Sequence, residues 1–311
     1  MIATTDVDIA VSALTGGGVV AVPTETVYGL AADITQPAAV ERIFAIKGRP
    51  ADHPLIVHIA DFDGLAACAA EVPAAAARLA SAFWPGPLTV IVPRRGDLDP
   101  TVAGGRDTVG VRMPAHPLTT AVIDRLGAPV AAPSANRFGA VSPTTAQHVL
   151  ADLGPFLDPQ RDAVLDGGPC RVGLESTIVD CTVDPPQILR AGAITGDQID
   201  AAIERAHAPS SGPARASGML PSHYAPRARV IVVDDRDAAN SAVAAATTAG
   251  RRAAIIDHTD DLVEYAHELY ADLRRLDAQG YDEIVALVPP AHGLGAAIAD
   301  RLYKAAGPRP S

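Results

Sequence analysis

The chain has 311 residues, of which 48% are hydrophobic and 20% charged, a composition that suits an ordinary folded enzyme and excludes wholesale disorder. This length exceeds the usual size of one compact core, so we expect two domains. The net charge of −11 argues against a protein that wraps nucleic acid, because phosphate binding draws on a concentrated basic surface.

The first ten residues carry acidic side chains and no Lys or Arg, unlike the start of a signal peptide. The Ala-rich stretch over 66–82 is interrupted by charged residues and a proline and is too short to cross a membrane. We therefore expect a cytoplasmic location. The cysteines form neither an even set for disulfides nor a C-x-x-C pair for zinc, so buried, inert thiols are expected at Cys68, Cys170 and Cys181.

Strand and helix patterns alternate along the first two thirds of the chain. β-Branched runs predict strands at 19–22, 55–59, 88–92, 108–111, 130–132, 177–179 and 188–189. Apolar periodicity predicts helices at 38–46, 73–82, 118–126 and 144–153. The Pro- and Gly-rich joints, such as 84–87, are too irregular for a simple doubly wound fold. An α/β domain with a twisted mixed sheet is therefore expected over residues 1–205.

A change of composition to Pro, Ser, Gly and Ala predicts a linker over 206–228. Its interior, 219–226, is apolar and aromatic, so part of the linker is expected to dock on the protein. Beyond it, strands at 229–233, 253–257 and 283–288 alternate with helices at 238–248, 262–277 and 294–305. This alternation predicts a smaller Rossmann-like α/β domain over 229–311.

The common nucleotide signatures are absent. No G-x-x-x-x-G-K-[ST] loop occurs, because Gly16-Gly17-Gly18 is followed by valines and not by lysine. The pair Gly293 and Gly295 lacks the third glycine of a dinucleotide fingerprint. Any nucleotide site must therefore be built from other residues.

Polar residues cluster where predicted strands end. Pro23-Thr-Glu-Thr-Val-Tyr-Gly-Leu30 follows an apolar strand, where α/β proteins bind ligands, although a threonine cap on a plain turn would explain one hydroxyl. Lys47-Gly-Arg-Pro50 ends a helix, where cations are favoured by the helix dipole. Gly48 and Pro50 would hold Lys47 and Arg49 as a rigid cation pair, which suits a polyphosphate. His58 lies on an apolar strand, and taken alone it is more simply a buried core histidine.

Further polar residues follow along the chain. Arg112 lies in a β-branched run, where a buried arginine needs a carboxylate or phosphate partner. Ser142 is either an ordinary helix cap or part of an anion site. With Ser134, Ser176 and Arg190, these residues predict a cleft that suits a substrate carrying phosphates and a carboxylate.

Five ordered motifs closely resemble the YrdC-type threonylcarbamoyl-adenylate synthases. They are Pro23-Thr-Glu-Thr-Val-Tyr-Gly-Leu30, Lys47-Gly-Arg-Pro50, Pro54-Leu-Ile-Val-His58, Pro133-Ser-Ala-Asn136 and Ser176-Thr-Ile-Val-Asp180. The stretches Ser222-His-Tyr-Ala-Pro226 and Gly293–Leu302 are similar to the longer branch of that family, which adds a linker and a second Rossmann-like domain. The resemblance implies a YrdC-like fold. It also implies synthesis of threonylcarbamoyl-AMP and pyrophosphate from L-threonine, bicarbonate and ATP with Mg²⁺.

The resemblance also assigns site residues. It implies Lys47 and Arg49 as catalytic cations and a threonine site made of Thr26, His58, Arg112, Ala132 and Ser176. The implied ATP contacts are Lys47, Arg49, His53, Thr108, Ser134, Ser142, Arg190 and Tyr224. The family commonly has Asn where this chain has His53, so that contact departs from its pattern. No protein metal site is expected.

The resemblance implies that a tRNA threonylcarbamoyl transferase receives the product, with weak or no direct tRNA binding and no membrane partner. Two other functions stay open. Carbamoyl transferases of hydrogenase maturation include a similar domain, but they add Cys-rich zinc motifs that three scattered cysteines do not supply. An RNA-binding translation factor without catalysis is the second alternative, and the net charge of −11 disfavours it.

Overall fold

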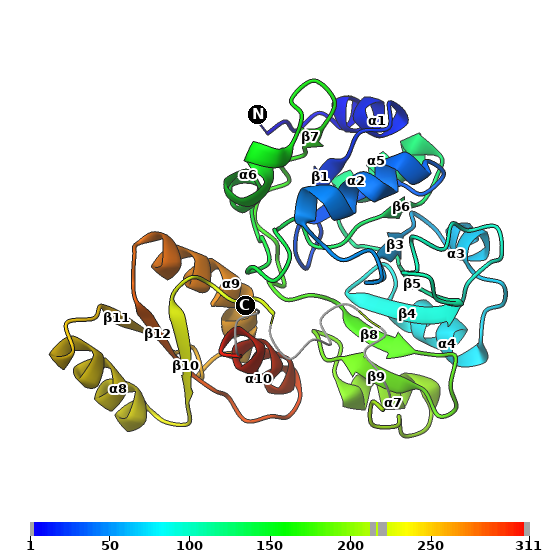
Figure 1. The fold of residues 1–311 in the computed structure, drawn as a ribbon. Coiled ribbons are helices and arrows are strands. Elements are labelled where there is room, and N and C mark those ends of the chain that lie inside the picture. Colours follow the sequence, from blue (N-terminus) through cyan, green and yellow to red (C-terminus); the bar gives the residue numbers. More distant parts are fainter. Residues whose placement is uncertain (1–2, 212–215, 217–222, 308–311) are drawn as a thin grey trace.

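The computed structural model describes residues 3–211, 216 and 223–307, which form two sheets with their own helices (Figure 1). The larger sheet has nine strands in the order β7-β1-β2-β6-β3-β5-β4-β8-β9. The strands are β1 Val20–Val22, β2 Gly29–Asp33, β3 Ile56–His58, β4 Leu88–Pro93, β5 Thr108–Arg112, β6 Val130–Ala131, β7 Ala163–Val164, β8 Thr177–Asp180 and β9 Gln187–Arg190. The pairs β1–β7, β3–β5 and β4–β8 are parallel and the others antiparallel, which confirms the predicted mixed sheet.

Helices pack around this sheet. They are α1 Val7–Thr15, α2 Pro37–Lys47, α3 Asp63–Cys68, α4 Ala74–Phe83, α5 Pro117–Leu126, α6 Ala146–Leu153, the 3₁₀ turn η1 Gly154–Phe156 and α7 Gly196–Ile203. Both α2 and α5 begin with proline and stop at a left-handed glycine, Gly48 (φ 63°) and Gly127 (φ 70°). The stop at Gly48 sets the position of the neighbouring cations.

The smaller sheet has the order β10-β12-β11, and all its strands are parallel. Its elements are β10 Arg229–Val233, α8 Arg236–Thr248, β11 Ala253–Ile256, α9 Leu262–Ala278, β12 Glu283–Leu287 and α10 Leu294–Ala305. Asp235 and Asp261 cap α8 and α9 by accepting backbone N–H bonds. The predicted Rossmann-like alternation is confirmed.

Helices α9 and α10 face the larger part of the chain (Figure 1). One hydrophobic cluster joins the two parts: Val27, Val141 and Leu174 pack with apolar side chains of the smaller part. Residues 212–215 and 217–222 lie outside the described residues. The proposed domain bounds and linker, including its interior from Met219 to Ser222, therefore stay predictions.

The three cysteines are buried and unpaired, as expected, and burial raises the pKa of each thiol to about 12. None of the helices in the described part of the chain has the length and apolar character that a membrane crossing requires.

Candidate functional site

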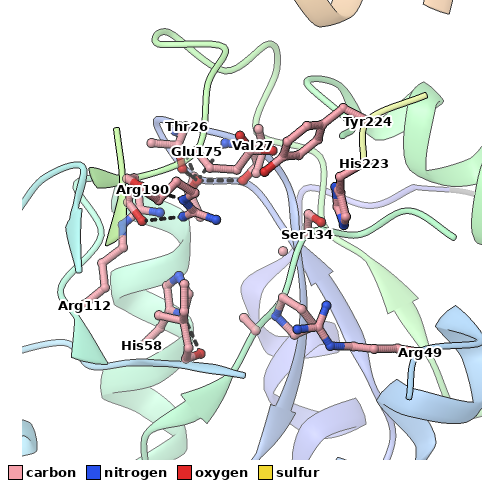
Figure 2. Close-up of a pocket in the computed structure, with 16 residues that line it drawn as sticks. Thr26, Val27, Arg49, His58, Arg112, Ser134, Glu175, Arg190, His223 and Tyr224 are labelled. Atoms are coloured by element: carbon pink, nitrogen blue, oxygen red, sulfur yellow. Dashed lines mark hydrogen bonds between the residues drawn. The ribbon is translucent and has the colours of Figure 1, made fainter. Parts of the chain in front are cut away.

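A pocket lies where the ends of several strands of the larger sheet meet residues 223–224 (Figure 2). Its walls come from the β1–β2 connection, the turn after α2, β3, β5, the segment after β6, the segment just before β8, and β9. Its lining residues are Thr24, Thr26, Val27, Gly29, Arg49, Ile56, His58, Arg112, Ala132, Pro133, Ser134, Glu175, Ser176, Arg190, His223 and Tyr224.

All five residues expected to bind threonine line this pocket: Thr26, His58, Arg112, Ala132 and Ser176. Thr24 organises the first of them, because its Oγ1 lies 2.8 Å from Thr26 Oγ1 and donates to the Val27 carbonyl at 2.6 Å. Strands β3 and β5 pair in parallel with His58 opposite Arg112, so both side chains reach the same end of the sheet. The strand ends thus place hydroxyls, a cation and an imidazole in one wall.

Arg112 forms a buried ion pair, with Nη2 2.7 Å from Oε1 of Glu25, and its Nε donates to the Gly86 carbonyl at 3.3 Å. Burial alone would raise the pKa of Glu25, but the Arg112 charge holds that pKa below its ordinary value. The carboxylate partner that sequence reasoning required for Arg112 is therefore Glu25, a member of the first motif.

His58 is 3% exposed, and its Nδ1 lies 3.2 Å from the Ile56 carbonyl. A carbonyl only accepts, so Nδ1 carries the proton and Nε2 is an acceptor. Burial, reinforced by the Arg112 charge, lowers the pKa of His58 to about 3. The imidazole is neutral at pH 7.

This shift predicts a pH effect on stability. The pKa of His58 in the folded protein, about 3, lies below its ordinary value of 6.5. The contribution of neutral His58 to the free energy of unfolding is therefore complete above pH 6.5 and is lost as the pH falls. Between pH 7 and pH 5 the free energy of unfolding should fall about 2 kcal/mol more in the wild type than in His58→Gln. Urea unfolding at both pH values measures this, and equal losses in both proteins would contradict it.

Of the residues expected to bind ATP, Arg49, Ser134, Arg190 and Tyr224 line the same pocket. Figure 2 shows Arg49 and Tyr224 across the pocket from His58 and Arg112. Arg49 donates to the Pro54 carbonyl at 2.9 Å, and burial lowers its pKa to about 10, so it remains charged at neutral pH. The pocket therefore contains cations on both sides.

Lys47 does not line this pocket. Its ammonium donates to the carbonyls of Ser134 and Asn136, each at 2.5 Å, and the residue is only 2% exposed. Burial, followed by the charge of Arg49, lowers its pKa well below the ordinary lysine value. Gly48, in its left-handed conformation, turns the chain between the cations, so Lys47 lies behind the wall and Arg49 in it.

Three other predicted ATP contacts also lie outside the pocket lining. Thr108 lines a neighbouring cavity with Ile56, which borders both cavities. His53 packs its ring edge against Phe138, with centroids 5.2 Å apart. Ser142 is fully buried and donates to Glu175 at 2.5 Å.

Sequence reasoning missed Glu175 and His223 as pocket residues. Glu175 directly precedes the Ser176 motif, and His223 lies inside the motif Ser222-His-Tyr-Ala-Pro226, so a position in or beside a motif was the available signal. Tyr224 is 1% exposed with φ +62°, and Ala225 N–H donates to Gly139 of the larger part at 3.0 Å. The backbone of Tyr224 is thus held in a conformation that non-glycine residues seldom adopt.

Two family models match the chain. The Sua5/YciO/YrdC model, described as telomere recombination, matches residues 12–192, and the threonylcarbamoyl-AMP synthase C-terminal domain model matches residues 194–307. The Pyrococcus abyssi threonylcarbamoyl-AMP synthase is 40% identical, covering 97% of this chain and 94% of its own. The Bacillus subtilis threonylcarbamoyl-AMP synthase is also 40% identical, covering 94% and 90%. The crystal structure of P. abyssi Sua5 complexed with L-threonine gives a TM-score of 0.89 at 40% identity, covering 96% of this chain and 94% of that one.

Proposed function

This chain belongs to the Sua5/YrdC family of threonylcarbamoyl-AMP synthases, and we propose that its pocket converts L-threonine, bicarbonate and ATP to threonylcarbamoyl-AMP and pyrophosphate. The observation that carries the proposal is the composition of this pocket. Thr26, His58 and Ser176 offer the small polar contacts that an amino acid needs, while Arg49 and Arg190 offer charge for phosphates. Family membership over nearly the whole chain, residues 12–192 and 194–307, favours this activity over the two alternatives.

The reaction needs little proton transfer from the protein. Bicarbonate and the threonine amine give a carbamate and water, and one carbamate oxygen then attacks the α-phosphate of ATP while the bond to pyrophosphate breaks. Holding the carbamate in line with the leaving group and stabilising developing negative charge are the main tasks. Arg49 and Arg190 are buried cations suited to the second task. This explains why no acid–base pair stands out in the motifs.

Neutral His58 has a specific part in this proposal. With its proton on Nδ1, the Nε2 atom accepts a hydrogen bond from a threonine hydroxyl or ammonium group. Arg112 is proposed to bind the threonine carboxylate while it also pairs with Glu25. One missing methyl is worth about 1–3 kcal/mol, so discrimination against serine is expected to be modest.

Magnesium is proposed to enter as part of the substrate, bound to the phosphates of ATP. Glu175, which lines the pocket, pairs with Arg301, and Glu25, which lies behind the lining, pairs with Arg112. Within the described ranges no group of three His, Cys, Asp or Glu side chains is placed to hold a metal. Mg²⁺ usually keeps several waters and takes substrate phosphates as ligands, so this arrangement fits it. Its chemistry would be to neutralise phosphate charge.

We also propose that the product passes to a tRNA threonylcarbamoyl transferase, with little direct tRNA binding by this chain. The cytoplasmic location expected from the sequence stays a prediction.

The function is tested by measuring pyrophosphate from purified protein with magnesium ATP, bicarbonate and threonine. Omitting threonine, or replacing it with alanine, should abolish release. Mass spectrometry should find threonylcarbamoyl-AMP in the complete mixture alone. Pyrophosphate release that does not depend on threonine would overturn the proposal. Tight RNA binding at 150 mM salt without turnover would favour the RNA-binding translation factor.

A second prediction concerns Lys47. Lys47→Met should lower turnover about tenfold, because the ammonium no longer fixes the carbonyls of Ser134 and Asn136 beside the pocket. Lys47→Arg should not restore it, since a planar guanidinium does not fit the position of a buried ammonium. Steady-state pyrophosphate assays measure both variants. Normal turnover by Lys47→Met would contradict any role of Lys47 in the reaction.

A further inference from the structure

We infer that the C-terminal part of the chain positions the pocket through one buried carboxylate, with Arg301 of α10 and Tyr270 of α9 holding Glu175 in place. Glu175 lines the pocket and is followed directly by Ser176, which also lines it. Arg301 and Tyr270 lie outside that lining. The inference rests on the proposed function for its kinetic test and adds positioning residues to the same site.

The segment from Gly173 to Ser176 lies between α9 and the pocket. A Cβ added at Gly173 would come within 2.4 Å of the Ala266 carbonyl oxygen, so this backbone meets α9 with no room for a side chain. Leu174 is 0% exposed, and it lies in the hydrophobic cluster that the two parts share. The C-terminal helices therefore fix the course of the chain just before it enters the pocket wall.

The carboxylate of Glu175 completes this contact. Arg301 Nε donates to Oε2 at 2.9 Å, Tyr270 Oη donates to the same oxygen at 2.8 Å, and Ser142 Oγ donates to Oε1 at 2.5 Å. Burial alone would raise the pKa of Glu175, but the charges of Arg301 and Arg190 hold it at about 2. Glu175 is therefore charged at neutral pH, and Arg301, which is 0% exposed, is its ion-pair partner.

Arg301 also supports the side of the pocket formed by Tyr224. Its guanidinium carbon lies 5.4 Å from the centroid of the Tyr224 ring, and the Tyr224 and Tyr270 rings lie 5.5 Å apart. A cation over a buried tyrosine face is stabilising. The same two C-terminal side chains thus contact Glu175 on one wall and Tyr224 on another.

The charge balance explains why Arg301 matters for substrate binding. Arg190 donates from Nε to the Ser176 carbonyl and from Nη2 to the Ser176 hydroxyl, both at 3.0 Å. After Arg301, Arg190 is the next cation acting on Glu175. Without Arg301, the buried carboxylate attracts Arg190 away from Ser176, because a buried charge requires a partner. Arg190, the proposed ATP contact, and Ser176, the proposed threonine contact, then both lose their positions.

The test uses the full chain and four proteins: wild type, Arg301→Met, Glu175→Gln/Arg301→Met and Asp152→Asn. Arg301→Met should raise the KM for ATP and for threonine about tenfold with a smaller change in kcat. The double variant should return both KM values to within about threefold of the wild type, because it removes the uncompensated carboxylate together with its partner. A role of Arg301 in packing alone would give no such rescue.

Asp152→Asn is the matched control. Asp152 pairs with Arg274 of α9 at 2.6 Å and so links the same two parts of the chain without contacting Glu175, and its replacement leaves the bonds from Arg274 to the Val141 and Ser142 carbonyls in place. The KM values of the Asp152→Asn variant should equal those of the wild type. If they rise as much as in Arg301→Met, loosened docking in general is the cause and the inference is overturned. A double variant as impaired as Arg301→Met overturns it too.

Two further measurements separate the possible failures. Calorimetry of magnesium ATP binding, which needs no turnover, should show an affinity about tenfold lower in Arg301→Met and restored in the double variant. Absence of threonine-dependent turnover in the wild type would therefore count against the proposed function, while the binding series still decides the inference. If Arg301→Met does not fold, Tyr270→Phe removes one hydrogen bond to Glu175 and should raise the ATP dissociation constant about threefold. An unchanged constant in that variant would overturn the inference.

Discussion

Arg112→Met is expected to abolish measurable threonine binding and to lower the free energy of unfolding by about 3–5 kcal/mol. The Arg112 and Glu25 side chains are 5% and 4% exposed, and their charged atoms lie 2.7 Å apart. Removing the guanidinium leaves the Glu25 carboxylate buried without its counter-charge. Calorimetry with threonine and urea unfolding measure the two effects separately.

A second variant distinguishes the two roles of Arg112. Glu25→Gln/Arg112→Met removes both charges, so most of the lost stability should return. Threonine binding should not return, because Arg190, the remaining cation beside Ser176, is already held by the Ser176 carbonyl and hydroxyl. If the double variant binds threonine as the wild type does, Arg112 serves Glu25 alone and the proposed contact with the substrate is wrong.

Local sequence patterns predicted most of the strands but not β2 or β7. Strand β2, Gly29–Asp33, contains Gly and Ala where a strand usually has β-branched residues, and all five residues are buried. It exists because β1 and β6 pair with it on either side. Strand β7 has two residues, Ala163 and Val164, which is too short for any periodic pattern. Tertiary pairing supplies both.

The candidate site was predictable where a motif lies at the end of a strand. His58 is the last residue of β3, Thr26 follows β1, and Ser176 directly precedes β8, and all three line the pocket at these strand ends. The sequence alone could not separate Lys47 from Arg49, because the difference depends on the turn at Gly48. Nor could it pair Glu175 with Arg301, since 126 residues separate them along the chain. Long-range contacts of this kind follow from the fold and not from local spacing.

Arg49→Met is the substitution expected to reduce catalysis most strongly. Arg49 lies in the pocket wall, 8% exposed, and burial lowers its pKa only to about 10. It therefore keeps its charge at neutral pH in surroundings that strengthen electrostatic interactions. Loss of one such preorganised donor typically costs about 10²–10³ in rate, and we expect kcat/KM for ATP to fall by that factor.

Stability should change little in the same variant. Arg49 donates to backbone carbonyls and lies 5.7 Å from the Phe138 ring centroid, and a methionine keeps much of that apolar contact. Arg106→Met is the control, because Arg106 also donates to a nearby carbonyl, that of Asp52, yet does not line the pocket. It should leave kcat/KM unchanged. Equal losses in both variants would show that a general loss of positive charge, and not the position of Arg49, lowers the rate.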